Sequence, residues 1–264
     1  MSRRPASFQF LLFFVLIAAS VSAQVRSGGK TYTYLIYHKL APGMTIQNAM
    51  PVEREWKAIN QAAVDEGKLI GWHMMVKQFS SNPNPAEYDY VTCIVSPTMG
   101  MGGASPAAMA KLYGDSVQVR MADLNRRDRL TAPVVRIDIW ENLDALYGPD
   151  FSPGKTQTVV VDFLKLRDPL ADWPGTLASL KQTGSTLIDQ KQAGGWSFSA
   201  LKVPAGSEKG YGFALTRPVT SLNVLADPTD PKLAAAQKQL NRLFEVVRQE
   251  VYRFELFTTR PAAK

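Results

Sequence analysis

The stretch GKLIGWHMMV (residues 67–76) has a counterpart in the second half of the chain, AGGWSFSA (residues 193–200). In both places a Gly-Trp pair follows a segment with helical spacing of apolar residues and opens a run that is typical of a strand. Glycine often ends a helix, because it adopts left-handed backbone angles at little cost. The recurrence of this joint, with Trp72 in one copy and Trp196 in the other, indicates an internal duplication.

The first half contains two helical patterns among four strand patterns. Pro51 and Pro106 can each open a helix, since proline is accommodated in the first helical turn. Helices are predicted at residues 51–67 and 106–129, and strands at 32–40, 69–79, 88–95 and 134–140. The order is β-α-β-β-α-β.

The second half repeats this order. Asp230 is suited to cap a helix that Pro231 opens, and apolar residues from Leu233 to Val251 recur at helical spacing. Helices are predicted at residues 173–194 and 230–251, and strands at 158–166, 196–203, 211–216 and 252–257. A Pro- and Gly-rich linker at 147–154 separates a first repeat, 30–146, from a second, 155–260.

The N-terminus is typical of a secretory signal peptide. Arg3 and Arg4 precede an apolar run at residues 8–19, and the small residues of VSA (21–23) suit cleavage after Ala23. We therefore expect a periplasmic or extracellular protein. The alternative is a membrane anchor, but a span needs about 20 apolar residues and this run is shorter. No stable membrane insertion is expected after cleavage.

Composition and charge exclude some functions. The formal net charge is +7 and spread along the chain, and the single cysteine, Cys93, excludes an internal disulfide. The stretch KGYGFALT (residues 209–216) fits the first five positions of an RNA-recognition motif. However, Asp162 and Thr216 stand where that motif needs aromatic residues, so no nucleic-acid partner is predicted.

Three short motifs together resemble a known superfamily. They are E-W-K (residues 55–57), G-x-x-x-G-W (67–72) and Y-D-Y-V (88–91), and they resemble the dimeric α/β-barrel proteins, in particular exported bacterial members without an assigned activity. The resemblance implies an α+β fold of two tandem ferredoxin-like repeats that form an intramolecular, barrel-like pseudo-dimer. Relatives include small monooxygenases, stress-responsive proteins and haem-binding proteins, so the fold does not select a function.

Strand alternation suggests a binding surface inside such a pseudo-dimer. Arg136, Asp138 and Trp140 share one face of their strand, opposite a wholly apolar face that we expect to pack on helices. The charged faces would then line the space between the sheets. The predicted ligand-binding residues are Tyr37, Trp72, Arg136, Asp138, Trp140, Arg253 and Glu255. The alternative is that these charges simply pair with one another.

His38 and His73 are the two histidines of the chain. They fall on strands that are not neighbours in a ferredoxin-like sheet, and no metal-ligand spacing is present, so no metal site is predicted. The second repeat has no histidine for a haem iron, so no cofactor is expected. Either histidine could act as a general base, or both could be hydrogen-bonded structural residues.

Three hypotheses of function follow. The first is an exported protein that binds a small molecule or acts as an accessory protein. The second is a cofactor-independent enzyme of the monooxygenase type, with His73 or His38 as the base. The third is a structural protein without a ligand, and a homo-oligomer remains open in each case. The first two require a buried site with converging polar groups, which the third does not.

Overall fold

The computed structural model describes residues 30–259, except 82–83, 85–86, 150, 207–208 and 227–229. The predicted signal peptide at residues 1–23 lies outside the described residues. The strands are β1 (Thr31–His38), β2 (Gly71–Ser80), β3 (Tyr90–Ser96), β4 (Val134–Tyr147), β5 (Thr158–Leu166), β6 (Gly195–Val203), β7 (Phe213–Val219) and β8 (Phe244–Phe257). The α-helices are α1 (Ile46–Asp65), α2 (Pro106–Tyr113), α3 (Val117–Thr131), α4 (Pro174–Asp189) and α5 (Pro231–Leu243).

These strands close into one antiparallel barrel with the order β1-β3-β2-β8-β5-β7-β6-β4. Each half of the chain contributes four adjacent strands, β4-β1-β3-β2 and β8-β5-β7-β6. Two ladders join the halves, one between β2 and β8 and the other between β4 and β6. The predicted α+β class and barrel are confirmed, and one chain closes the barrel without a second copy.

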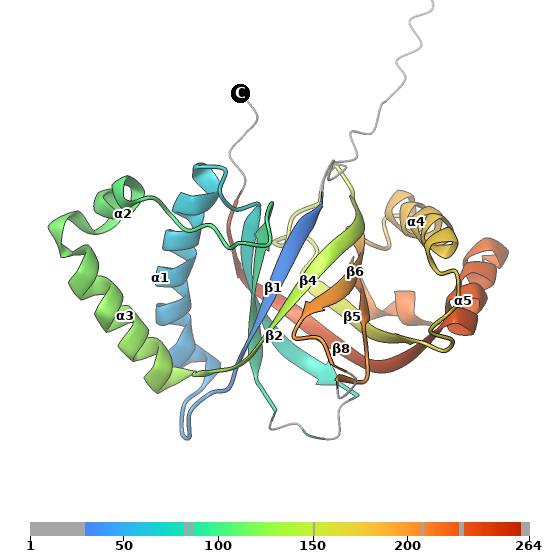
Figure 1. Cartoon of the computed structure of the whole chain (residues 1–264), viewed down its shortest axis with the longest axis horizontal. Helices are drawn as coiled ribbons and strands as arrows, with labels where there is room; N and C mark the ends of the chain where they lie inside the picture. The colour runs from blue at the N-terminus through green and yellow to red at the C-terminus, as the bar shows by residue number, and fades with distance from the viewer. Residues whose placement is uncertain are drawn as a thin grey trace, which may run out of the picture.

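The helices form two layers on opposite sides of the barrel, with α1, α2 and α3 on one side and α4 and α5 on the other (Figure 1). One apolar core lies inside the barrel, and others lie beneath each helical layer. Trp72 and Trp196 are each the second residue of their strand, each 2% exposed, and pack in the clusters beneath α1 and α4 respectively. The repeated Gly-Trp therefore anchors a helical layer in each half.

Helix α1 begins earlier than the sequence predicted. Thr45 caps it in a box with Asn48, whose side-chain oxygen accepts the backbone N–H of Thr45 at 2.8 Å. This cap satisfies donors that a helix start leaves unpaired, so the helix begins at Ile46 and Pro51 lies inside it. Proline at that place costs one backbone hydrogen bond, which the packing of α1 on the barrel offsets.

Two other helical predictions were wrong, one because the helix is interrupted and the other because it ends earlier. The helix predicted at residues 106–129 is broken into α2 and α3 at Gly114, whose φ of 58° is accessible to glycine. The helix predicted to reach residue 251 ends at Leu243, and β8 begins at the next residue. The segment after Leu243 forms ladders with both β2 and β5, and this pairing outweighs its apolar helical spacing.

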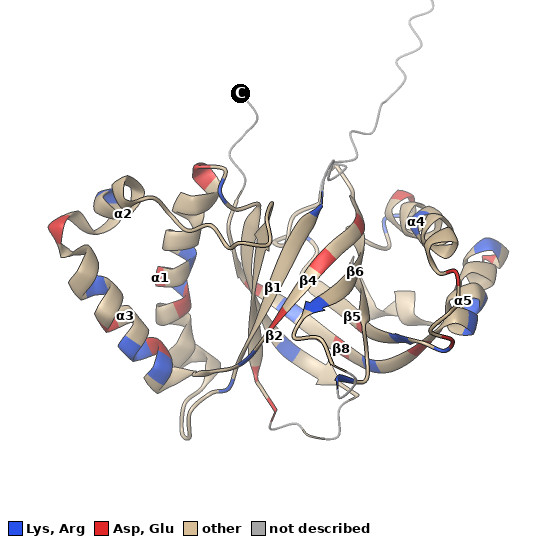
Figure 2. Ribbon diagram, viewed as in Figure 1, with Lys and Arg blue, Asp and Glu red and all other residues tan. Residues whose placement is uncertain are grey.

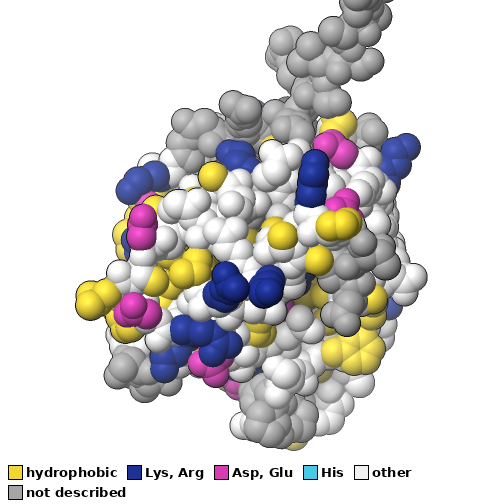
Figure 3. All heavy atoms as spheres, turned by 90° about the vertical axis from the view of Figure 1, so that its right-hand side faces the viewer, with side chains coloured by type: hydrophobic (Ala, Val, Ile, Leu, Met, Phe, Trp, Pro, Cys, Tyr) yellow, Lys and Arg dark blue, Asp and Glu magenta, His cyan; other side chains and the backbone are white. Residues whose placement is uncertain are grey.

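The outer surface has mixed character. Figure 3 shows basic side chains near the middle of the face over α4 and α5, with acidic and hydrophobic ones among them. This face therefore has no single-sign surface of the kind that nucleic-acid binding uses. None of the helices in the described part of the chain is both long and apolar enough to cross a membrane.

Replacement of Gly184 by alanine should destabilise the protein. A Cβ there would lie 2.7 Å from Cγ of the buried Trp196 ring, so α4 or the ring must move. Overpacking of this kind costs about 1–3 kcal/mol of unfolding free energy. In the same helix, Gly175→Ala would place its Cβ no closer than 3.9 Å to Asp172 and should cost nothing. Urea unfolding of both variants measures the difference, and equal stability would contradict this packing.

Candidate functional site

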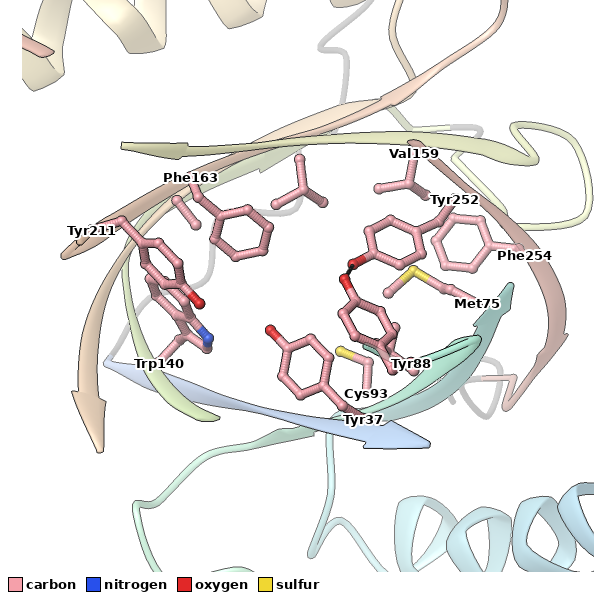
Figure 4. Packing of buried hydrophobic residues seen from close by; sticks show 13 residues of the cluster. Tyr37, Met75, Tyr88, Cys93, Trp140, Val159, Phe163, Tyr211, Tyr252 and Phe254 are labelled. Atoms are coloured by element: carbon pink, nitrogen blue, oxygen red, sulfur yellow. Dashed lines mark hydrogen bonds between the residues drawn. The ribbon is translucent and has the colours of Figure 1, made fainter. Parts of the chain in front are cut away.

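The interior of the barrel is lined by aromatic and small apolar side chains from both halves of the chain (Figure 4). Trp140 and Tyr211 lie with nearly parallel rings, with centroids 6.1 Å apart and planes 11° apart. Phe163 packs on Tyr211 at a centroid distance of 4.9 Å. The buried residues of this interior cluster are Tyr37, Met75, Tyr88, Val91, Cys93, Trp140, Val159, Val161, Phe163, Tyr211, Ala214, Tyr252 and Phe254.

A chain of ion pairs begins inside the barrel at Asp138, which is completely buried. Lys209 Nζ lies 2.7 Å from Asp138 Oδ1, and Arg136 Nε lies 3.4 Å from Asp138 Oδ2. The same Arg136 donates from its Nη1 to Glu87 Oε1 at 2.5 Å. Figure 2 shows charged residues on the central strands as well as on the helices. Because a buried charge is costly unless it is paired, this arrangement explains how Asp138 is tolerated.

The chain of pairs continues through Arg248 to β8. Arg248 bonds Glu87 with its terminal nitrogens, and its Nε donates to Glu250 Oε1 at 2.7 Å. Glu250 is completely buried and accepts hydrogen bonds from the hydroxyls of Tyr88 and Tyr252, whose oxygens lie 2.8 Å apart. We call these paired residues the interior charge network, which consists of Lys209, Asp138, Arg136, Glu87, Arg248 and Glu250. It links β4 and β8 with residues of two loops.

Besides Arg136 Nε and Asp138 Oδ2, which form an ion pair with each other, three polar atoms of the interior are buried without a hydrogen-bond partner among the described residues. They are Tyr37 Oη, Trp140 Nε1 and Lys77 Nζ. In Figure 4 the polar atoms of Tyr37 and Trp140 point toward the middle of the barrel. Lys77 Nζ lies 3.9 Å from the centroid of the Tyr88 ring. This cation–π contact stabilises the positive charge, but it provides no hydrogen-bond acceptor for the ammonium group. An unmade hydrogen bond at a buried group costs about 1–3 kcal/mol, so such atoms are expected to meet a ligand or water.

The electrostatics of the interior keep its phenols protonated and its arginines charged. Burial raises the pKa of Tyr37 well above its usual range, and burial raises the pKa of Tyr211 to about 12. Burial opposes the charge of Arg136, but its contacts with Tyr37, Tyr211 and Asp138 outweigh this and raise its pKa. Burial lowers the pKa of Lys77. The interior therefore presents hydrogen-bond donors.

The structure brings four of the predicted ligand-binding residues together inside the barrel. These are Tyr37, Arg136, Asp138 and Trp140. Trp72 lies instead on the outer face of β2, in the cluster covered by α1. The predicted burial of the opposite face of β4 is corrected for Val135 and Ile137, which are 49% and 46% exposed, whereas Ile139 packs against the cluster beneath α1.

The predicted inward orientation of Arg253 and Glu255 is also corrected. Their side chains pair at 2.7 Å on the outside of the barrel, where that of Arg253 is 54% exposed. Tyr252 and Phe254, which alternate with them on β8, point inward and belong to the interior cluster.

The two histidines lie on opposite sides of the barrel wall. His73 packs edge-to-face on Phe254 of the interior cluster, with centroids 5.6 Å apart. His38 is buried on the outer side, where its ring stacks on Tyr90 and bonds Thr92. Burial lowers the pKa of His38 to about 4, against a smaller opposing effect of its hydrogen bond with the Ala132 carbonyl. His38 is therefore neutral and does not face the interior.

Sequence reasoning missed Lys77, Glu87, Arg248 and Glu250. Strand alternation could have indicated three of them, because Lys77 shares a strand face with Met75, and Arg248 and Glu250 share one with Tyr252. Alternation was not applied to Arg248 and Glu250, because residues up to 251 were predicted to be helical. Glu87 lies in the loop between β2 and β3, where strand alternation gives no guide.

Comparison with known proteins shows similarity of fold. No protein family matches the chain, and no curated protein is similar in sequence. A protein of Fusobacterium nucleatum, provisionally described as a monooxygenase, is 8% identical with a TM-score of 0.54 over 89% of this chain and 95% of its own. A protein of Lactobacillus acidophilus with the same provisional description is 8% identical, with a TM-score of 0.52 over 89% of this chain and 98% of its own. These similarities show a shared fold and are consistent with the resemblance to dimeric α/β-barrel proteins seen in the sequence.

Cys93 should be unreactive in the native protein. Its thiol lies in the interior cluster, and burial raises the pKa of the thiol to about 12, so almost no thiolate forms at pH 8. A disulfide reagent at pH 8 should release no thiolate product from native protein. It should release one equivalent after denaturation, since the chain has 1 cysteine. Rapid reaction of native protein would contradict the burial of the Cys93 thiol.

Arg248→Met should strongly destabilise the protein. The change leaves Glu250 buried without its cation and removes one partner of Glu87. Breaking a buried ion pair from one side costs about 3–5 kcal/mol. The control is Arg253→Met on the same strand, whose exposed pair with Glu255 is worth at most about 1 kcal/mol. Chemical unfolding compares the two, and similar losses would show that the network is not buried as described.

Proposed function

We propose that this protein binds a small molecule inside the barrel. The observation that carries the proposal is the presence of buried polar atoms without partners, Trp140 Nε1 and Tyr37 Oη, directed at the middle of an aromatic-lined interior. Binding sites for small molecules are typically apolar with a few converging polar groups. A purely structural core would instead be expected to satisfy or omit such groups.

The chemistry of these atoms favours an aromatic ligand with an anionic group. The indole nitrogen of Trp140 and the ammonium of Lys77 only donate hydrogen bonds, so they require an acceptor. The interior groups include four cations, Lys77, Arg136, Lys209 and Arg248, against three carboxylates, Glu87, Asp138 and Glu250. The carboxylate of an aromatic acid would neutralise this excess of one positive charge, and its ring would stack among the interior aromatic rings.

A thermal-shift assay tests this with benzoate and 1-naphthoate against their uncharged amides. At 100 times its dissociation constant a ligand stabilises by about 2.7 kcal/mol. For a chain of this size that corresponds to a rise in Tm of roughly 5–10 °C. We expect the carboxylates to raise Tm and the amides to raise it less. If neither carboxylate binds, or the amides bind equally well, the anionic site is wrong.

Two interior variants should weaken carboxylate binding. Lys77→Met and Trp140→Phe each remove a donor, and a hydrogen bond to a charged group is worth about 1.5–3 kcal/mol. Affinity should therefore fall about 10- to 100-fold. The control is Trp72→Phe, on the outer face of β2, which should bind as the unmodified protein does. Isothermal titration calorimetry measures all three.

The second candidate function is cofactor-independent oxygenation. It is supported by His73, which packs on the interior residue Phe254, and by fold similarity to two proteins provisionally described as monooxygenases. In this reading His73 would remove the proton of a bound phenol. Oxygen uptake with 1,4-dihydroxynaphthalene that disappears in His73→Gln would favour the enzyme. Binding without oxygen uptake would favour the binding protein.

Two further expectations belong to this proposal. The halves, 30–146 and 155–260, are inferred to be tandem ferredoxin-like repeats, supported by their equal strand order and by the like positions of Trp72 and Trp196.

Residues 1–23 are inferred to direct export. Mass spectrometry of the protein isolated from its native cells should then give Gln24 as the first residue. An N-terminus at Met1 would contradict cleavage.

A further inference from the structure

A second group of chemically active side chains lies on the outer side of the barrel wall, beneath the first helical layer. His38 ends β1, Glu53 belongs to α1 and Asp128 belongs to α3. One ligand atom of each lies within 4.8 Å of the others. His38 is 3% and Glu53 1% exposed and Asp128 is half-buried, so the group lies at the inner side of the helical layer.

The imidazole of His38 is held as metal-bound histidines usually are. Its Nδ1 lies 3.1 Å from the carbonyl oxygen of Ala132. A carbonyl only accepts hydrogen bonds, so Nδ1 bears the proton and the electron pair of Nε2 accepts from the Thr92 hydroxyl, a bond that a metal ion would replace. Metal-ligating histidines commonly donate their second nitrogen to a backbone carbonyl in this way. The parallel ring of Tyr90, 4.6 Å away, and Thr92 Oγ1, 3.0 Å from Nε2, fix the orientation.

The two carboxylates have no cationic partner. Among residues 30–259 as described, no lysine or arginine forms an ion pair with Glu53 or Asp128. The bond that Glu53 accepts from the Tyr90 hydroxyl, at 2.7 Å, is neutral on the donor side. The Asp128 carboxylate accepts a hydrogen bond from the Trp56 side chain, and its Oδ1 is buried without a hydrogen-bond partner among the described residues. Buried carboxylates ordinarily pair with a cation or coordinate a metal.

We infer that His38 Nε2, Glu53 and Asp128 form a binding site for a divalent transition-metal ion. Two ligand atoms of a tetrahedral zinc ion lie roughly 3.3–3.6 Å apart, because each bond is about 2.0–2.2 Å long. The three ligand atoms, now up to 4.8 Å apart, therefore need to approach one another by about 1 Å when the ion binds. One imidazole and two carboxylates suit Zn²⁺ or Mn²⁺ better than Ca²⁺, which takes oxygen ligands alone.

This site is independent of the proposed interior ligand. Tyr37 and His38 are adjacent on β1, and their side chains point to opposite sides of the barrel wall. No residue of the interior charge network belongs to the metal group. Metal binding can therefore succeed or fail without affecting the test of carboxylate binding.

Calorimetric titration of EDTA-treated protein with ZnCl₂, MnCl₂ and CaCl₂ tests the inference. We expect one Zn²⁺ or Mn²⁺ per chain and no Ca²⁺. Glu53→Gln keeps an acceptor for Tyr90 and should bind Zn²⁺ at least about 10-fold more weakly, since a lost ligand costs no less than a lost outer-shell partner. Asp128→Asn is a second ligand variant in case the first does not fold. Asp65→Asn, an exposed carboxylate on α1, is the matched control and should bind normally.

Two outcomes would overturn the inference. One is the absence of any saturable Zn²⁺ or Mn²⁺ binding by the folded protein. The other is binding that Glu53→Gln and Asp128→Asn leave as strong as in Asp65→Asn, because the ion would then lie elsewhere. X-ray absorption of the zinc-loaded protein gives a direct check, with one histidine nitrogen expected among oxygen ligands.

Discussion

The structure depends on the two ladders that join the halves of the chain, β2 with β8 and β4 with β6. Each half taken alone would leave these strands as open edges with unpaired backbone donors and acceptors. When the halves meet, every strand has two neighbours, and a single interior forms to which both halves contribute. The interior cluster and its charge network exist only because this closure occurs.

Closure also explains why charged side chains can lie inside the barrel. Asp138 comes from the first half and Glu250 from the second, and both are completely buried. They are tolerated because Arg136, Arg248 and Glu87 connect them across the junction. Removing one member of such a network leaves an unpaired buried charge, which lowers the free energy of unfolding more than replacing both partners of a pair by apolar residues does. The network thus favours one registration of the two halves over alternatives.

The barrel wall separates two chemically different environments. Tyr37 and Trp140 present donors to an aromatic interior, whereas His38 and Glu53 present acceptors and an electron pair beneath a helical layer. Adjacent residues of one strand reach both, because side chains alternate across a strand. The two sites that we propose, one for an anion and one for a cation, would therefore be separated by a single layer of strands.

Periodicity and turn residues in the sequence were enough to determine the element order, the α+β class and the inward placement of Arg136, Asp138 and Trp140, because these follow from local alternation. Tertiary structure decided what local patterns cannot. Residues after Leu243 became β8 because two neighbouring strands pair with them. Arg253 turned outward because the barrel, not a helix, buries Tyr252. His38, Glu53 and Asp128 come from distant segments, and only the packing of α1 and α3 on the sheet brings them together.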